Sequence, residues 1–268
     1  AVQAIVAHDG DVLAVMGALV HKLTHCLRFV LYPGGHDAEA GLIFEVMNNR
    51  GKPLSQADRV KNYLMYAAQK SGMHAESIEN ISAKWGLIFK AVMRSVPDGL
   101  KSNDVESRLL RTHWVLFKEA APPREQRTWS ISQRIREDMA LLPQQCDSAD
   151  NAPSRALHDR IEAYTNSLSD SAQQYALIMH PTLDKGRNWN REFDRAEELV
   201  DTLRSFSRMS HTASALPILL AGLNRLQAHP EQMLELAKAL ATFSFRVYAI
   251  AHHRGNTGQS EFRRKANR

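Results

Sequence analysis

Apolar residues recur at intervals of three and four along most of this chain, the spacing that places side chains on one face of an α-helix. The segments that show it are 11–25, 38–48, 55–70, 77–95, 104–119, 131–141, 154–180, 191–209, 213–228 and 230–252. We find neither an internal repeat nor a sustained heptad pattern. The sequence therefore predicts a mainly α fold, a multi-helix bundle.

One stretch has the character of a β-strand. CLRFVLY, residues 26–32, carries branched and aromatic residues and stops at a Pro-Gly-Gly turn. A single strand cannot make a sheet, so we expect it to complete a sheet with strands from upstream sequence. Because the sequence enters on alanine without a recognisable start, we also expect it to be part of a longer chain.

Two of the predicted helices meet around residues 48–62, which we call the corner. Gly51 is suited to the left-handed conformation that closes a helix, and Pro53 prevents that helix from resuming. Ser55 and Asp58 then form a capping-box pattern, in which a hydroxyl and a carboxylate each accept from the other residue's amide. A second helix is expected to begin there.

The second helix of the corner has an apolar and a polar face. Its apolar stripe consists of Val60, Tyr63, Leu64 and Ala67. Asp58, Lys61 and Asn62, spaced at i, i+3 and i+4, share a different face. A well-capped corner with solvated polar groups accounts for the capping residues without any function. It does not explain why amide and basic side chains gather there, namely Asn48, Arg50, Lys61 and Asn62.

A longer pattern, FxxxNxRGxxLSxxDxxKN, runs through the corner. The residues that meet it are Phe44, Asn48, Arg50, Gly51, Leu54, Ser55, Asp58, Lys61 and Asn62. This pattern resembles the second signature of the GmrSD-type restriction endonuclease N-terminal domain family. A weaker likeness extends to the preceding strand and acidic helix, to ALPILLAGL at 215–223, and to FSFRVYAIAHHRGN with Arg246.

The resemblance implies that residues 1–70 are the end of a ParB-like domain and that residues 71–268 form an all-helical domain. Family members resemble modification-dependent or phage-defence nucleases, in which a ParB-like domain binds and hydrolyses a nucleotide and an HNH domain cuts DNA. The chain would then be the central region that couples the two. For the full-length protein the family implies a nucleoside triphosphate, a divalent metal and DNA, modified or not. Assembly into a homo-oligomer is left open.

The resemblance also implies a nucleotide-binding or coupling role for six residues of the corner: Asn48, Arg50, Gly51, Asp58, Lys61 and Asn62. Asn48 would hydrogen-bond the nucleotide or fix the neighbouring loop. Arg50 would pair with phosphate, which its planar guanidinium can contact through two parallel hydrogen bonds. Asp58 and Lys61 would hold the corner rigid.

Two family motifs are missing, however. The first signature, DGQQR, associated with nucleotide hydrolysis, occurs nowhere in the sequence, and HDGDVLA at 8–14 does not replace it. The HNH motif is also absent: His252, His253 and Asn256 have no preceding aspartate or following histidine to complete one. We therefore expect no complete catalytic machinery and assign no catalytic residue. His21 and His25 lack a third ligand, so we assign no metal site.

Charge adds a second candidate surface. The net charge of +5 is concentrated near the end of the chain, and Arg254, Arg263, Arg264 and Lys265 form a weaker candidate for nucleic-acid contact. The alternative function is a non-catalytic helical module that binds DNA or protein. In that interpretation the corner is a helix-turn-helix that presents Arg59, Lys61 and Asn62 to a DNA groove.

Cysteine content and hydropathy bear on the compartment. The chain has only Cys26 and Cys146, too few for a disulfide framework, and we expect both to be buried hydrophobic residues in a reducing, cytoplasmic setting. The longest apolar run is far shorter than the roughly 20 residues that a membrane helix needs, so we expect no membrane association. The four tryptophans are expected to pack in the core or at an interface rather than to stack on bases.

Overall fold

The described part of the chain is mainly α-helical, as the apolar spacing predicts. The computed structural model describes residues 12–27, 54–96, 102–118, 130–139, 152–181, 193–209 and 212–266. Within these ranges there is no β-strand. The chain's contacts form two compact units, Ala1–Asp37 and Ala38–Arg268.

The first unit contains helix α2 (Val12–His21), followed by a π-helical turn, η1 (Lys22–Cys26). Cys26, the first residue of the predicted strand, closes this turn, and the Leu27 amide donates to the Lys22 carbonyl at 3.1 Å. Helical hydrogen bonding thus prevails over strand propensity at Cys26, and the backbone is extended at Leu27, while residues 28–32 of the predicted strand lie outside the described residues. Cys26 is exposed, so the prediction that it is buried is wrong, and Cys146 is not described.

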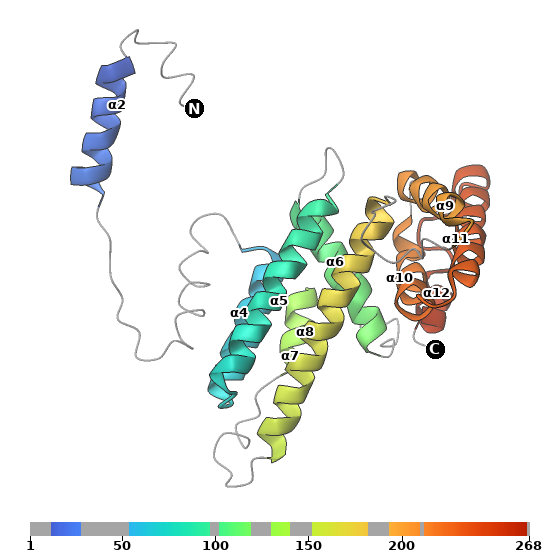
Figure 1. The fold of residues 1–268 in the computed structure, drawn as a ribbon, viewed down its shortest axis with the longest axis horizontal. Helices are drawn as coiled ribbons and strands as arrows, with labels where there is room; N and C mark the ends of the chain where they lie inside the picture. Colours follow the sequence, from blue (N-terminus) through green and yellow to red (C-terminus); the bar gives the residue numbers. More distant parts are fainter. Residues whose placement is uncertain are drawn as a thin grey trace. The chain divides into compact units, whose positions relative to one another are not determined.

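The second unit holds the other described helices (Figure 1). They are α4 (Gln56–Lys70), α5 (Ala75–Arg94), α6 (Ser102–Phe117), α7 (Ile131–Asp138), α8 (Ala152–Met179), α9 (Ala196–Arg208), α10 (Leu216–Arg225), α11 (Pro230–Ser244) and α12 (Gln259–Ala266). A 3-10 turn, η4 (Thr212–Ser214), precedes α10, and a π-helical segment, η5 (Phe245–Ile250), follows α11. The predicted helix 38–48 lies outside the described residues.

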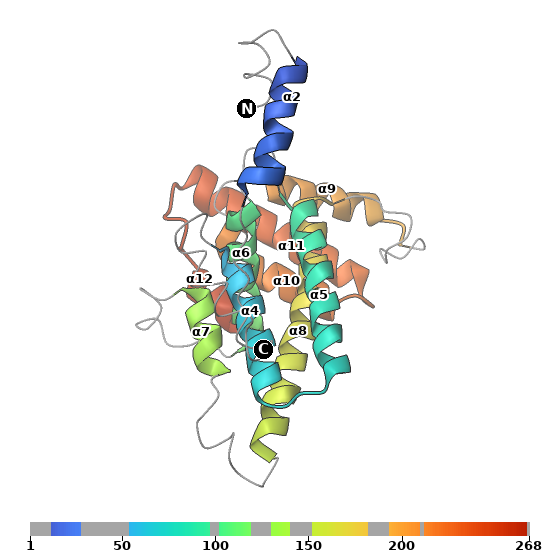
Figure 2. The same ribbon diagram turned by 90° about the vertical axis from the view of Figure 1, so that its left-hand side faces the viewer.

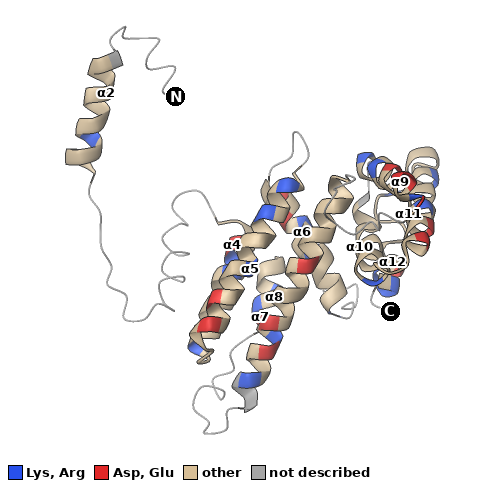
Figure 3. Ribbon diagram, viewed as in Figure 1, with Lys and Arg blue, Asp and Glu red and all other residues tan. Residues whose placement is uncertain are grey.

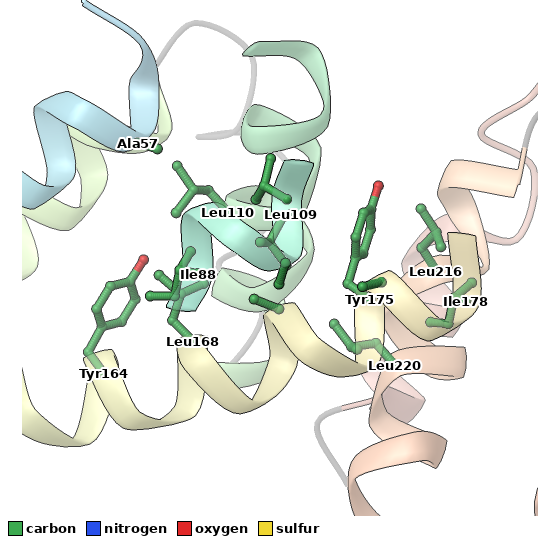
Figure 4. Close-up of a cluster of buried hydrophobic side chains, with 14 of the residues drawn as sticks. Ala57, Ile88, Leu109, Leu110, Tyr164, Leu168, Tyr175, Ile178, Leu216 and Leu220 are labelled. Carbon is green, nitrogen blue, oxygen red and sulfur yellow. The ribbon is translucent and has the colours of Figure 1, made fainter. Parts of the chain in front are cut away.

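Helix α8 is the longest described helix and organises the core. Its neighbour α5 runs alongside it, and α4, α6 and α10 also pack against it (Figures 1 and 2). Tyr164 and Leu168 of α8 lie on the side of α5 and α6, whereas Tyr175 and Ile178 lie near α10 (Figure 4). These four side chains are completely buried. Through α8, one hydrophobic core continues from α4 to α11.

Helix α9 shows how the sequence pattern becomes packing. Its apolar residues at helical spacing, Leu199, Val200, Leu203 and Phe206, are all buried, and the helix packs against α11. On its polar side the Glu198 carboxylate pairs with Arg195 at 2.8 Å and with Lys238 of α11 at 2.6 Å. These bonds, first from Arg195 and then from Lys238, lower the pKa of Glu198 to about 2. Lys and Arg intermingle with Asp and Glu over this region (Figure 3).

The short helix α7 is fixed beside α4 by polar contacts. The Tyr63 hydroxyl of α4 lies 3.0 Å from the Met139 carbonyl and 3.2 Å from the Arg136 carbonyl. The buried Asp138 carboxylate pairs with Lys118 and lies 3.8 Å from Arg160. These contacts tie α4 and α7 to α6 and α8.

The division between the two units falls well before the end of α4. Helix α4 contributes Ala57, Val60 and Leu64 to the same core as α5 and α8. That residues 1–70 belong to a ParB-like domain stays a prediction. Among the helices that the structure describes, none is long and apolar enough to cross a membrane.

Candidate functional site

The start of α4 is the part of the corner that the structure describes. Ser55 is the N-cap residue: its Oγ accepts from the Asp58 amide at 3.1 Å, and the Asp58 carboxylate accepts from the Ser55 amide at 3.2 Å. This reciprocal pair confirms the predicted capping box. Asp58 therefore has a defined role, fixing the first turn of α4. Asn48, Arg50 and Gly51 lie outside the described residues.

Glu106 of α6 is a buried acid next to this capping box and is not among the site residues predicted from the sequence. Burial raises the pKa of Glu106, a hydrogen bond with Ser55 lowers it, and the neighbouring Asp58 raises it again. Two carboxyl groups thus lie close together below the N-terminus of α4, whose positive dipole end favours negative charge. The spacing in the sequence indicates that Glu106 is buried. It lies three and four residues before Leu109 and Leu110, so the three residues share one buried face of α6.

The remaining corner residues lie on a helix that is covered on most sides. Lys61 and Asn62 are half-buried, and every residue of α4 before Lys70 is buried or half-buried. Helices α5, α6, α7 and α8 all contact α4. Arg59 has a buried Nε atom with no hydrogen-bond partner among the described residues. A recognition helix must present several side chains to a DNA groove, so this packing disfavours use of α4 in that way.

The four basic residues predicted near the end of the chain differ in their surroundings. Arg263, Arg264 and Lys265 belong to α12, a helix that the sequence analysis did not predict, whereas Arg254 precedes it and is exposed. Arg264 forms an ion pair with Glu261, in which Nε lies 3.0 Å from Oε2. Arg263 points elsewhere: it is half-buried and lines a groove with residues of α6.

A serine and a histidine meet in the core, but not as a catalytic pair. His113 Nε2 lies 3.0 Å from Ser167 Oγ, and His113 Nδ1 is buried without a hydrogen-bond partner in the described part of the chain. Complete burial lowers the pKa of His113 to about 3. Such an imidazole is a weak base, and no carboxylate among the described residues orients it. The pair therefore has the geometry of a neutral core histidine that is hydrogen-bonded to a serine.

The histidines considered for metal or nuclease chemistry are exposed. The His21 and His25 rings stack with centroids 4.7 Å apart, and His25 Nδ1 lies 2.6 Å from Thr24 Oγ1. His252 has a φ angle of 50°, which is uncommon for a residue with a side chain. In the described ranges, no three His, Cys, Asp or Glu residues are placed to hold a metal ion together.

Trp85 is fully buried in the core, as expected for a packing tryptophan, and Trp114 is half-buried against it. Trp129 and Trp189 lie outside the described residues.

The chain matches no protein-family model, no curated protein and no solved structure.

Proposed function

We propose that this chain is the central region of a GmrSD-like, modification-dependent or anti-phage DNA nuclease, and that the corner couples nucleotide binding to DNA cleavage. The proposal rests on the signature pattern that runs through the corner. The reciprocal Ser55–Asp58 capping box gives two residues of the signature a structural role, because it fixes the helix start that follows the proposed nucleotide contact.

The contacts of α4 supply a route by which the corner acts on the helical body. The first turn of α4 touches α7, where the Ser132 amide donates to Gln56 Oε1 at 3.3 Å. The same turn lies beside Glu106 of α6, and the two helices contact each other. A displacement of the corner on nucleotide binding would therefore move the helices packed against α4 and would not be absorbed by a flexible loop.

The alternative, a helix-turn-helix that reads DNA through Arg59, Lys61 and Asn62, is less well supported. Its second helix would have to project from the surface, whereas α4 is enclosed by four neighbouring helices. Coupling requires α4 to be packed against neighbouring helices, as it is, whereas reading DNA requires α4 to be accessible at the surface. A binding function elsewhere on the chain remains compatible with both.

Arg50→Ala tests the nucleotide contact in the protein encoded by the complete reading frame. If Arg50 contacts phosphate, the alanine variant should bind a nucleoside triphosphate about 10- to 150-fold more weakly, the range of a charge-assisted hydrogen bond. Its melting temperature should stay nearly unchanged, because the capping residues are intact. Isothermal titration calorimetry and thermal melts measure the two quantities.

Ser55→Ala is the matched control for that experiment. It removes the N-cap oxygen, so it should destabilise the protein by about 1 kcal/mol and lower the melting temperature without deleting a phosphate ligand. Equal nucleotide affinity in Arg50→Ala and wild type would remove the proposed site. So would a reading frame that encodes neither DGQQR upstream nor HNH downstream.

The 268-residue chain alone should neither hydrolyse nucleotides nor cleave DNA, because both family catalytic motifs are absent from it. Phosphate release and nicking of supercoiled plasmid are the measurements, each made with magnesium and a nucleoside triphosphate. Turnover that survives repurification and is abolished by a single substitution in this chain would contradict the prediction.

A further inference from the structure

Helix α5 presents one face to solvent along its whole length. Its buried residues, among them Trp85, Ile88 and Val92, belong to the core that α5 shares with α8. The exposed residues recur at alternating intervals of three and four, the spacing at which two helices pack along a seam. The residues of this α5 seam are Glu76, Glu79, Ala83, Gly86, Lys90 and Met93.

Two large apolar side chains are exposed on this face. Met93 lies on the last turn of the seam and is 65% exposed, and Leu87 borders the middle of the seam and is 48% exposed. Helices α4, α6 and α8 pack against other sides of α5. The part of the second unit that the structure describes therefore leaves apolar surface on α5 that a further partner would remove from water.

Nothing in the described part of the chain requires the glycine at the middle of the seam. A Cβ atom built on Gly86 meets no atom within 4 Å, and its backbone is helical. Glycine is a poor helix former, so almost any other residue would stabilise α5 more. The preceding seam residue, Ala83, is also small. Two small residues at this point let the backbone of another helix approach closely.

The charges of the seam change sign from one end of α5 to the other (Figure 3). Glu76 and Glu79 lie near its start, and Lys90 and Arg94 near its end. None of these four forms an ion pair in the described ranges. Lys84, by contrast, is bonded to Asn166 of α8. The dipole of a single helix favours this order of charges, but it does not account for the small and apolar residues between them.

We propose that α5 pairs with α5 of a second copy of this chain, antiparallel across a two-fold axis. In such a pair, residues equally far from the middle of the seam lie opposite each other. Ala83 of one copy then meets Gly86 of the other, where the two helices cross. Glu79 meets Lys90 on both sides of that crossing, so each dimer has this pair of opposite charges twice.

The order of charges selects this partner and this direction. The spacing of the seam is the same when it is followed from either end, whereas the sign of the charge is reversed. A second copy in the opposite direction therefore matches both, and Glu76 then lies beside Arg94 at each end. A parallel pair would place Glu79 against Glu79 and Lys90 against Lys90, which like-charge repulsion disfavours.

The dimer should be weak and measurable. Two helices about 30 Å long bury less surface than the interface of a permanent dimer, so we expect association in the micromolar range. Analytical ultracentrifugation of the 268-residue chain between about 1 and 200 µM should show a monomer–dimer equilibrium. A chain that stays monomeric throughout would overturn the proposal and leave this face to a different protein.

Glu79→Lys and Lys90→Glu test the pairing, first singly and then as a mixture. Each variant alone places like charges opposite each other at both pairs, so each should self-associate about tenfold or more weakly than the wild type. An equimolar mixture of the two variants should associate again, because each introduced charge then meets its opposite on the other chain. A dimer that survives in both single variants, or a mixture that stays monomeric, would overturn the α5 assignment.

Glu197→Lys is the matched control for charge. It makes the same change in net charge at an exposed acid near the start of α9 and should leave dimerisation unchanged. Weakening equal to that of Glu79→Lys would mean general repulsion between chains and would overturn the assignment. Thermal melts of every variant check that the fold is intact.

Gly86→Gln tests the close approach. Glutamine is the better helix former and its Cβ has open space in the single chain, so the melting temperature should rise slightly. Its longer side chain should hold two copies apart and weaken the dimer about tenfold. Unchanged dimerisation would contradict the crossing at Gly86 and, with it, the proposal. Arg50→Ala should leave the dimer unchanged, so this inference and the coupling function can fail separately.

Discussion

Trp85→Ala should destabilise the second compact unit by about 3 to 5 kcal/mol, the usual range for truncating a buried tryptophan. Trp85 is fully buried on α5, the helix that packs along α8. Alanine would leave a cavity at this contact, since backbone helices cannot close around a missing indole. For a unit of this size the melting temperature should fall by about 10 °C or more, as measured by calorimetry.

Comparison of Trp85→Phe with Trp85→Ala separates the contribution of the indole's volume to stability from that of its N–H group. The Trp85 Nε1 atom is buried and has no hydrogen-bond partner in the described ranges. Phenylalanine removes that unpaired donor while keeping a ring beside Phe89, whose ring centroid is 6.0 Å away. The variant should therefore lose only about 1 kcal/mol. Equal destabilisation by Phe and Ala would show that a phenyl ring does not replace the packing of the indole, contrary to this prediction.

The sequence predicts the described helices well, because helix formation here depends on local periodicity and capping. Ser55 and Asp58 mark the start of α4 through contacts only three residues apart. Helix α12 was not predicted, because its sequence is dominated by charge and only Phe262 and Ala266 pack inward. Its position depends on α10 and α6, and no local pattern contains that information.

The candidate site residues also differ in how far the sequence alone predicts them. Asp58 could be assigned from spacing, because its partner is a neighbour in sequence. The groove that Arg263 lines with α6 could not, because Arg263 and Arg111 are more than 100 residues apart and meet only through tertiary packing. Charge counting placed Arg263 with Arg264 and Lys265, whereas in the structure Arg263 lines the groove and Arg264 pairs with Glu261.

The fully buried His113 makes the stability of the protein sensitive to acid. The pKa of an ordinary histidine is 6.5, and burial lowers that of His113 to about 3. Between these values the unfolded chain binds a proton that the folded protein excludes. Folding is therefore favoured above pH 6.5, and this contribution is lost as the pH falls, at about 1.4 kcal/mol per pH unit. Glu106, whose pKa burial raises, acts in the opposite direction.

Urea unfolding at several pH values should accordingly show a loss of about 2 to 3 kcal/mol between neutral pH and about pH 4.5 from His113 alone. His113→Phe keeps a ring against Tyr164 and Phe117 but cannot be protonated, so stability should depend less steeply on pH by about 1 kcal/mol per unit. The variant loses the bond to Ser167, which lowers stability at every pH and leaves the difference in slope intact. His180→Gln removes an exposed imidazole and serves as the control. An identical pH dependence in His113→Phe and wild type would mean that His113 accepts a proton in the folded state, contrary to its burial among the aromatic rings.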